Sequence, residues 1–210
     1  MTRRHSVLIF SLVAILLALM VIVGVTYALF SDSVKISNHI DAGTLKITLV
    51  RESLTGSALA NDGTLETVTD NNVKDFTKSE DNVFNLKTGD LVVPKSTYTA
   101  NMKITNNGSV AFGYWVEIKI NGATPTGKDL ALAQQLKVTV TPNGGSAQSS
   151  YVDKGLYVGS QAAPVATVLK NASATFSVTV LFDDLAANNS AELGSLTFDL
   201  VVHAIQVTSK

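Results

Sequence analysis

Few residue types that carry catalytic or metal chemistry occur in this chain of 210 residues, which has no cysteine and three histidines. The lack of cysteine excludes disulfide frameworks, thiolate zinc sites and cysteine nucleophiles. The histidines are His5, His39 and His203, and none belongs to a His-Glu-x-x-His pair of the kind that binds catalytic zinc. A Gly-x-Ser-x-Gly nucleophile motif and a Walker loop are also absent from the sequence. We therefore name no catalytic residue and expect no metal and no cofactor.

Weaker candidates for a binding site have plainer interpretations. Asp183 and Asp184 could bind calcium at the rim of a sheet, but a solvated strand end is the favoured interpretation. Trp115 could stack on a sugar, but it is expected on the outward face of its strand, packed under a loop. His39 and His203 are interpreted as exposed or edge histidines, with His203 on the outward face of the last strand.

The N-terminus begins with Arg3 and Arg4 and continues with 24 uncharged residues from Val7 to Phe30. A helix of this length would measure about 36 Å, enough to cross a bilayer core of about 30 Å. The run is longer than the apolar region of most signal peptides, which favours a retained anchor. Its C-terminal end has the small residues of a cleavage region, which favours a signal peptide.

Cleavage after Ala28 would place Thr26 at position −3 and make Leu29 the new N-terminus. Residues 1–28 are thus interpreted as a signal peptide that is cleaved, with a retained anchor as the alternative. Both interpretations place residues 29–210 outside the cytoplasm, because the positive flank stays inside. The formal net charge of −1 provides no basic field, so we expect no nucleic-acid partner.

Beyond the apolar run, apolar and polar residues alternate with the period of two that is typical of half-buried strands. The segment 53–82 is instead polar and is expected to be a long, mobile excursion. Asn106-Asn107-Gly108 is a hairpin signal, because Asn and Gly tolerate a positive φ. Short helical segments are expected at 128–135 and 185–193. Strands are expected at 43–51, 83–86, 97–105, 111–120, 136–141, 156–158, 165–169, 175–182 and 194–207.

This series of strands and turn signals predicts an all-β fold, an antiparallel sandwich with jelly-roll or Greek-key connections and one or two short helices. A hydrophobic signal helix would precede it. The exported part, around 180 residues, is long enough to bury a core without disulfides.

Several stretches together resemble the TasA/camelysin family of exported Gram-positive proteins. They match in order and spacing, cover the first half of the chain well, and include one departure, Thr88 where the family usually has proline. The closing strand, 196–207, is similar in character only. The stretches are TYALFSD (26–32), SNHIDAGTLKITL (37–49), NLKTGD (85–90) and ITNNGS (104–109).

The resemblance implies a jelly-roll domain at 43–210 that builds fibres in the extracellular biofilm matrix of a Gram-positive-type bacterium. It implies cleavage by a dedicated signal peptidase, contact with the membrane during export, and a secreted or cell-surface location. The freed segment 29–42 of one subunit would add as a strand to the next copy or to a related fibre subunit. The apolar residues expected to form this donor strand are Leu29, Phe30, Val34, Ile36 and Ile40.

The sequence of this segment suits the role, because alternating apolar positions allow it to complete an open sheet edge. A head-to-tail contact that does not close on itself propagates as a filament.

One alternative is that residues 30–40 fold back as the first strand of their own domain. Two other functions remain open. One is a camelysin-like metalloendopeptidase, which the two exported histidines disfavour. The other is a membrane-anchored adhesin or binding module.

Overall fold

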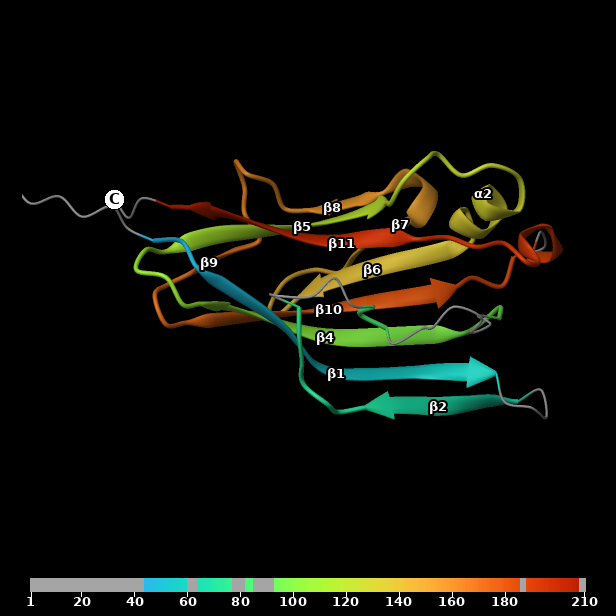
Figure 1. Cartoon of the computed structure of the whole chain (residues 1–210), viewed down its shortest axis with the longest axis horizontal. Coiled ribbons are helices and arrows are strands. Elements are labelled where there is room, and N and C mark those ends of the chain that lie inside the picture. Colours follow the sequence, from blue (N-terminus) through green and yellow to red (C-terminus); the bar gives the residue numbers. More distant parts are fainter. Residues whose placement is uncertain (1–43, 60–63, 77–81, 85–92, 186–187, 208–210) are drawn as a thin grey trace, which may run out of the picture. The chain divides into compact units, whose positions relative to one another are not determined.

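The computed structural model describes residues 44–59, 64–76, 82–84, 93–185 and 188–207 (Figure 1). All of them belong to one unit of the chain, Gly43–Lys210. The predicted signal segment 1–28 and the predicted donor segment 29–42 lie outside the described residues, and both stay predictions.

The described residues form two antiparallel sheets. The larger contains β1 (Ile47–Leu59), β2 (Leu65–Asp70), β3 (Lys74–Asp75), β4 (Thr97–Asn106), β6 (Leu136–Pro142), β7 (Gln148–Tyr151) and β10 (Ser173–Phe182). Its order is β2-β1-β4-β10-β6-β7, and β3 also pairs with β1. The smaller sheet contains β5 (Phe112–Ile120), β8 (Leu156–Val158), β9 (Ala166–Val168) and β11 (Phe198–Gln206). Its order is β11-β5-β8, and β9 also pairs with β5.

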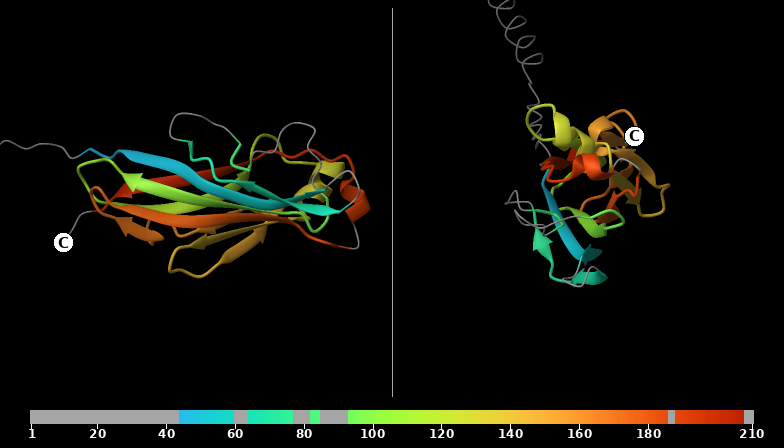
Figure 2. Two further views of the ribbon diagram at one scale, coloured as in Figure 1. Left: turned by 90° about the horizontal axis from the view of Figure 1, so that it is seen from below. Right: turned by 90° about the vertical axis from the view of Figure 1, so that its right-hand side faces the viewer.

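Alternate residues of both sheets point into one core, as the period-two pattern predicts. The Tyr114 ring of the smaller sheet lies 6.0 Å, centroid to centroid, from the Phe176 ring of the larger sheet. The two sheets therefore pack face to face, and the predicted all-β antiparallel sandwich is confirmed at this level (Figure 2). The buried residues of the three most central strands are Tyr98, Ala100, Met102, Ile104, Phe112, Tyr114, Val116, Ile118, Phe176, Val178, Val180 and Phe182.

The hairpin predicted at Asn106-Asn107-Gly108 is wrong. The chain does turn there, but β4 pairs with β1 and β10, whereas β5 pairs with β11, β8 and β9. The turn is therefore a corner that carries the chain from one sheet to the other. Asn-Gly specifies a backbone conformation that turns the chain, but it does not specify which strand pairs with the returning segment.

The first strand is longer than predicted, and part of the polar excursion is regular structure. A bulge between Arg51 and Ser53 shifts the register of β1, so that Leu54 points into the core with no exposed surface. Beyond the bulge β1 pairs with β2, which lies inside the predicted excursion 53–82. The strand predicted at 83–86 is also wrong where it is described, because Val83 and Phe84 form a turn.

Short elements complete the sandwich. The predicted helix is α2 (Gly127–Ala133), which buries Ala133, and the predicted helical turn near 190 is the 3-10 helix η2 (Asn188–Ala191). A second 3-10 helix, η1 (Val152–Lys154), follows β7. Neither η1 nor β7 was predicted from the sequence. The sequence of β7 is polar and half of it is exposed, so it lacks the apolar alternation that identifies a strand.

Candidate functional site

The first described residues of the sandwich are held by a defined set of hydrogen bonds. The Thr44 amide donates to the Ser109 hydroxyl at 2.8 Å, and the Ser109 amide donates back to the Thr44 carbonyl at 2.9 Å. The Asn107 amide donates to the Lys46 carbonyl at 2.8 Å. Residues 44–46 thus continue the line of β1 past the end of β4 and lie against the corner 106–109. We call this set of contacts the entry clamp.

Gly108 and Asn106 explain why the corner has its sequence. A Cβ atom at position 108 would collide with the Thr44 carbonyl oxygen and with the Lys46 nitrogen, so the close approach requires glycine. Asn106 is fully buried, and its amide nitrogen donates to the carbonyls of Val110 and Val168 at 2.8 and 3.0 Å. Its side-chain oxygen accepts from the Gly108 amide at 2.9 Å. Buried hydrogen bonds and a close backbone approach therefore define the shape of the corner, on which the entry clamp rests.

β11, which ends beside this corner, is fastened to its sheet by a polar cluster on the outer face. Oε2 of Glu117 in β5 lies 2.7 Å from Nε2 of His203 in β11, and Oε1 accepts from the Tyr157 hydroxyl of β8 at 2.7 Å. The His203 ring stacks on Trp115, with centroids 4.8 Å apart and an interplanar angle of 8°. Three neighbouring strands are thus tied together across one face of the smaller sheet.

The electrostatics of this cluster favour an ionised Glu117. The hydrogen bond from Tyr157, and after it that from His203, hold the pKa of the Glu117 carboxyl below its ordinary value. The same bond to Glu117 raises the pKa of the Tyr157 phenol. Because both carboxylate oxygens already have partners within the domain, the cluster is suited to holding strands in register.

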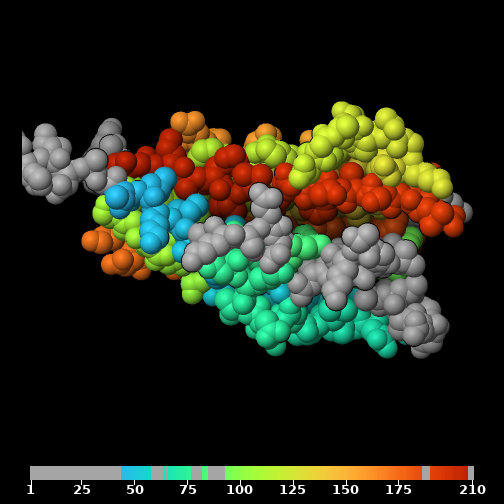
Figure 3. Space-filling model, in the orientation of Figure 1, coloured from blue at the N-terminus to red at the C-terminus, as the bar shows by residue number. Residues whose placement is uncertain are grey.

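The inward face of β11 is less well covered than that of its neighbour. Its Leu200, Val202 and Ala204 pack against the core but are only half-buried, whereas the inward residues of β5 from Phe112 to Ile118 are at most 1% exposed. The C-terminal strand reaches the molecular surface in the space-filling view (Figure 3). An apolar row at the margin of the sandwich is therefore only partly covered by the described residues.

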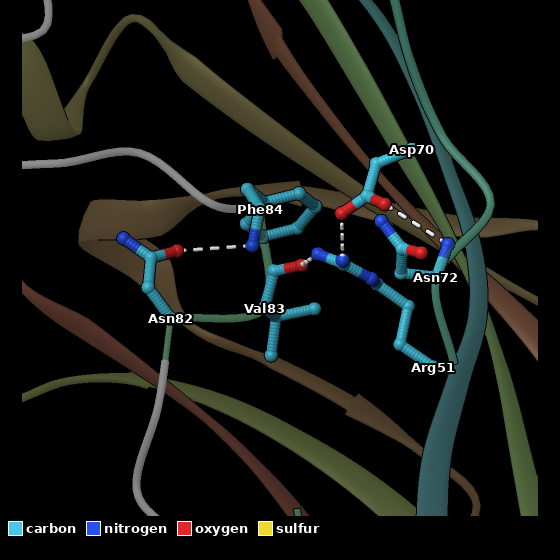
Figure 4. A network of polar contacts seen from close by, with 6 residues as sticks. All are labelled: Arg51, Asp70, Asn72, Asn82, Val83 and Phe84. Atoms are coloured by element: carbon cyan, nitrogen blue, oxygen red, sulfur yellow. Dashed lines mark hydrogen bonds and ion pairs between the residues drawn. The ribbon is translucent and has the colours of Figure 1, made fainter. Parts of the chain in front are cut away.

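At one end of this margin, Val83 and Phe84 form a turn that is bonded to β1. The buried Arg51 donates to the Val83 carbonyl at 2.7 Å and forms an ion pair with Asp70 of β2 (Figure 4). The neighbouring Phe84 ring lies 6.5 Å, centroid to centroid, from Phe198 at the start of β11. Phe84 thus fills the space between the two sheets at the end of the sandwich remote from the entry clamp.

Most residues that the sequence singled out lie outside the described part of the chain, namely His5, Thr26, Ala28, Leu29, Phe30, Val34, Ile36, His39 and Ile40. His203 lies on the outward face of β11 as predicted, and it is bonded there to Glu117. Trp115 packs on His203, so the two residues considered separately in the sequence are stacked. Asp183 accepts a hydrogen bond from Tyr151 at 2.8 Å, and Asp184 pairs with Lys95 at 3.0 Å.

Glu117 and Tyr157 were missed by the sequence reasoning. They lie 40 residues apart, and Glu117 is 86 residues from His203, so only the strand register brings them together. The one available signal was Glu117 itself, a carboxylate in the middle of a mostly apolar strand.

No cluster of three or more histidine, aspartate or glutamate side chains within the described residues is arranged to bind a metal ion. None of the helices built from them is both long and apolar enough to span a membrane. In comparisons with known proteins, no family model and no curated protein matches the chain.

Proposed function

We propose that this protein is an exported structural protein of the extracellular biofilm matrix, a fibre subunit or fibre accessory. A dedicated signal peptidase would remove residues 1–28. The freed segment 29–42 would then add as a strand to a neighbouring subunit, with the membrane involved only during export. In this proposal the sandwich has jelly-roll connections, and the family of the chain is the TasA/camelysin family that its motifs resemble.

The observation that carries the proposal is the entry clamp. Two of the stretches on which the family resemblance rests, 37–49 and 104–109, are far apart in the sequence but bonded to each other through Thr44, Lys46, Asn107 and Ser109. Their joint occurrence thus has a physical reason, because each provides half of one contact.

The clamp also supports a segment that acts outside its own domain. Residues 44–46 continue the direction of β1 beyond the end of β4, so the described chain begins at one end of the larger sheet. In the proposed fibre, this clamp would carry a pull on the donor segment into β1 and β4, the strands that its two halves adjoin. A fibre in which each subunit pulls on the next requires such an attachment.

Electron microscopy and a thioflavin-type dye test the proposal with purified residues 29–210. We expect filaments from this form and monomers when residues 29–40 are deleted, with the same urea unfolding midpoint, because the described core lies within 43–210. Ile36→Asp should abolish filaments, whereas the matched control Ser37→Asp, at the opposite parity, should retain them. Filaments that form equally well without residues 29–40, or a 29–210 protein that stays monomeric, would contradict the proposal.

Sequencing the N-terminus of the natural protein addresses the preceding step. A start at Leu29 or Phe30 is expected. An intact Met1 on membrane-bound protein would favour the anchored adhesin or binding module instead. The metalloendopeptidase alternative requires casein turnover that a chelator abolishes and that changes with His39→Ala or His203→Ala.

A further inference from the structure

The margins of the two sheets differ in what they offer to an added strand. β7 has four residues, with Gln148 and Ser149 exposed, and β8 and β9 have three residues each. β2 has six residues, and Glu66, Thr67 and Thr69 are exposed. β11 is nine residues long and has apolar residues along its inward face. Among the described margins, β11 alone combines length with a partly uncovered apolar row.

Every second residue of β11 directs its backbone amide and carbonyl groups away from β5, where an added strand could bond to them. At its two ends, the Asn121 amide donates to the Thr197 carbonyl and the Val207 amide donates to the Ala111 carbonyl. In an antiparallel pair the hydrogen-bonded positions alternate, so the odd-numbered residues of β11 bond to β5. The even-numbered residues, from Phe198 to Gln206, direct their amide and carbonyl groups away from β5, where no described strand lies.

The same even-numbered residues carry the half-buried inward side chains. A strand that pairs with this edge would therefore satisfy the outward backbone groups and cover Leu200, Val202 and Ala204 at the same time. Glu117 and His203 hold β11 against β5 on the outer face, so the edge is fixed before a partner arrives.

We infer that this edge of β11 is the acceptor for residues 29–42 of a second copy of the chain, an inference that rests on the proposed function. The segment has fourteen residues, which in extended form span about 46 Å, more than the roughly 30 Å of a nine-residue strand. Its Val34, Ile36 and Ile40 share one parity, and Ser33, Lys35 and Ser37 lie on the other. The first face thus offers Val34, Ile36 and Ile40 to the apolar row, with the polar Asn38 between the last two, and the other face would turn to solvent.

The direction of the chain at the entry clamp favours a second copy over the chain's own β11. β11 ends beside Ala111, at the same end of the sandwich as the clamp. To reach its own β11 edge, the chain would have to reverse direction immediately before Thr44 and cross to the other sheet. To reach a neighbour, the chain needs no such reversal.

Two assembly-defective variants test the acceptor edge. Ala204→Pro removes one outward amide without removing a bond to β5, so it blocks acceptance and leaves the donor segment intact. Deletion of residues 29–40 removes the donor and leaves the edge intact. Each protein alone should stay monomeric, and an equimolar mixture should form a dimer of one copy of each, measured by light scattering. A cooperative urea transition of the Ala204→Pro protein, measured separately, shows that it has folded. An Ala204→Pro protein that polymerises like the natural sequence would overturn the inference.

Cysteine cross-linking provides a second readout that does not depend on proline, and the chain has no cysteine of its own. Ile36→Cys in one copy is paired in turn with single cysteines in another copy, and the assembled mixture is oxidised. Intermolecular cross-links should form with inward positions of β11 and not with its outward face or with β2. The inward positions are Leu200, Val202 and Ala204, and the controls are Val201 and Thr67.

The outcomes separate the inference from the function on which it rests. Filaments that cross-link through Thr67 would overturn the assignment to β11 and leave donor-strand assembly standing. A chain that carries both Ile36→Cys and Val202→Cys tests the other possibility. Cross-links within one copy of this double variant would show that the segment folds back on its own domain, and would overturn the inference. Failure of the natural sequence to polymerise at all would refute the proposed function, and the acceptor role would fail with it.

Discussion

Replacing Asn106 with alanine tests whether the corner supports the entry clamp. The substitution removes three hydrogen bonds of 2.8 to 3.0 Å at a residue with no exposed surface. At about 1 kcal/mol for each bond, the free energy of unfolding should fall by about 3 kcal/mol. In an exported domain of this size that corresponds to a decrease in Tm of roughly 6–12 °C.

Aspartate at position 106 makes a sharper test than alanine. It keeps an oxygen that accepts from the Gly108 amide, but it places a second oxygen where the amide nitrogen now donates to Val110 and Val168. A carboxylate oxygen would then face the two carbonyl oxygens, and none of the three can donate a hydrogen bond. Asn106→Asp should therefore destabilise the protein more than Asn106→Ala, although aspartate is closer to asparagine in shape than alanine is.

Urea unfolding of residues 29–210 measures these differences, with Asn107→Ala as the matched control. Asn107 is adjacent, but its side chain lies at the surface and bonds to the Thr48 hydroxyl, so a loss of less than about 1 kcal/mol is expected. A loss below about 1 kcal/mol for Asn106→Ala, or an aspartate variant that is more stable than the alanine variant, would refute this account of the corner.

Further predictions concern the other buried contacts. Because hydrogen bonds lower the pKa of Glu117, its ionised form stabilises the fold above the ordinary value of 4.5, and this contribution disappears as pH falls through the lowered pKa. Glu117→Gln should therefore lower the free energy of unfolding by about 1 kcal/mol at pH 7. It should also make that free energy fall less steeply as the pH is lowered, which urea unfolding at several pH values measures. Asp70→Ala leaves the buried Arg51 charge unpaired and should cost about 3 kcal/mol in thermal unfolding, part of which the double variant with Arg51→Met regains. Gly108→Ala should push Thr44 from the corner and speed amide hydrogen exchange at the entry clamp; unchanged exchange would contradict the close approach.

Side-chain alternation allowed the inward faces of the long strands to be predicted. Tyr98 to Ile104, Phe112 to Ile118 and Phe176 to Phe182 are buried at every second position, because burial on one face imposes that period on the sequence. The closing strand shows the limit of this reasoning. Its inward residues follow the same pattern, and yet they are half-buried, because their coverage depends on whether another strand lies beside them.

Pairing partners could not be predicted from local sequence. Asn106-Asn107-Gly108 indicates a turn, but the returning strand finds its partners in β8, β9 and β11, all far along the chain. The polar strands β2 and β7 escaped prediction because margin strands with exposed faces need no apolar alternation.

The contacts of the candidate site have the same origin. The bonds of Thr44 to Ser109 and of Glu117 to His203 join residues that are 65 and 86 positions apart, so they follow from strand register alone. Sequence reasoning did identify His203 as outward-facing. It could not find the carboxylate on the adjoining strand, because that requires knowing that β11 pairs with β5.

Amide hydrogen exchange along β11, compared between monomer and filament, tests the central claim most directly. The amides of Leu200, Val202 and Ala204 point away from β5, whereas those of Val201 and His203 bond to it. We predict that assembly slows exchange at the three even-numbered residues and leaves the two odd-numbered ones as slow as before. Filaments in which the even-numbered amides exchange as fast as in the monomer would contradict the claim that a neighbour's N-terminal segment completes this sheet.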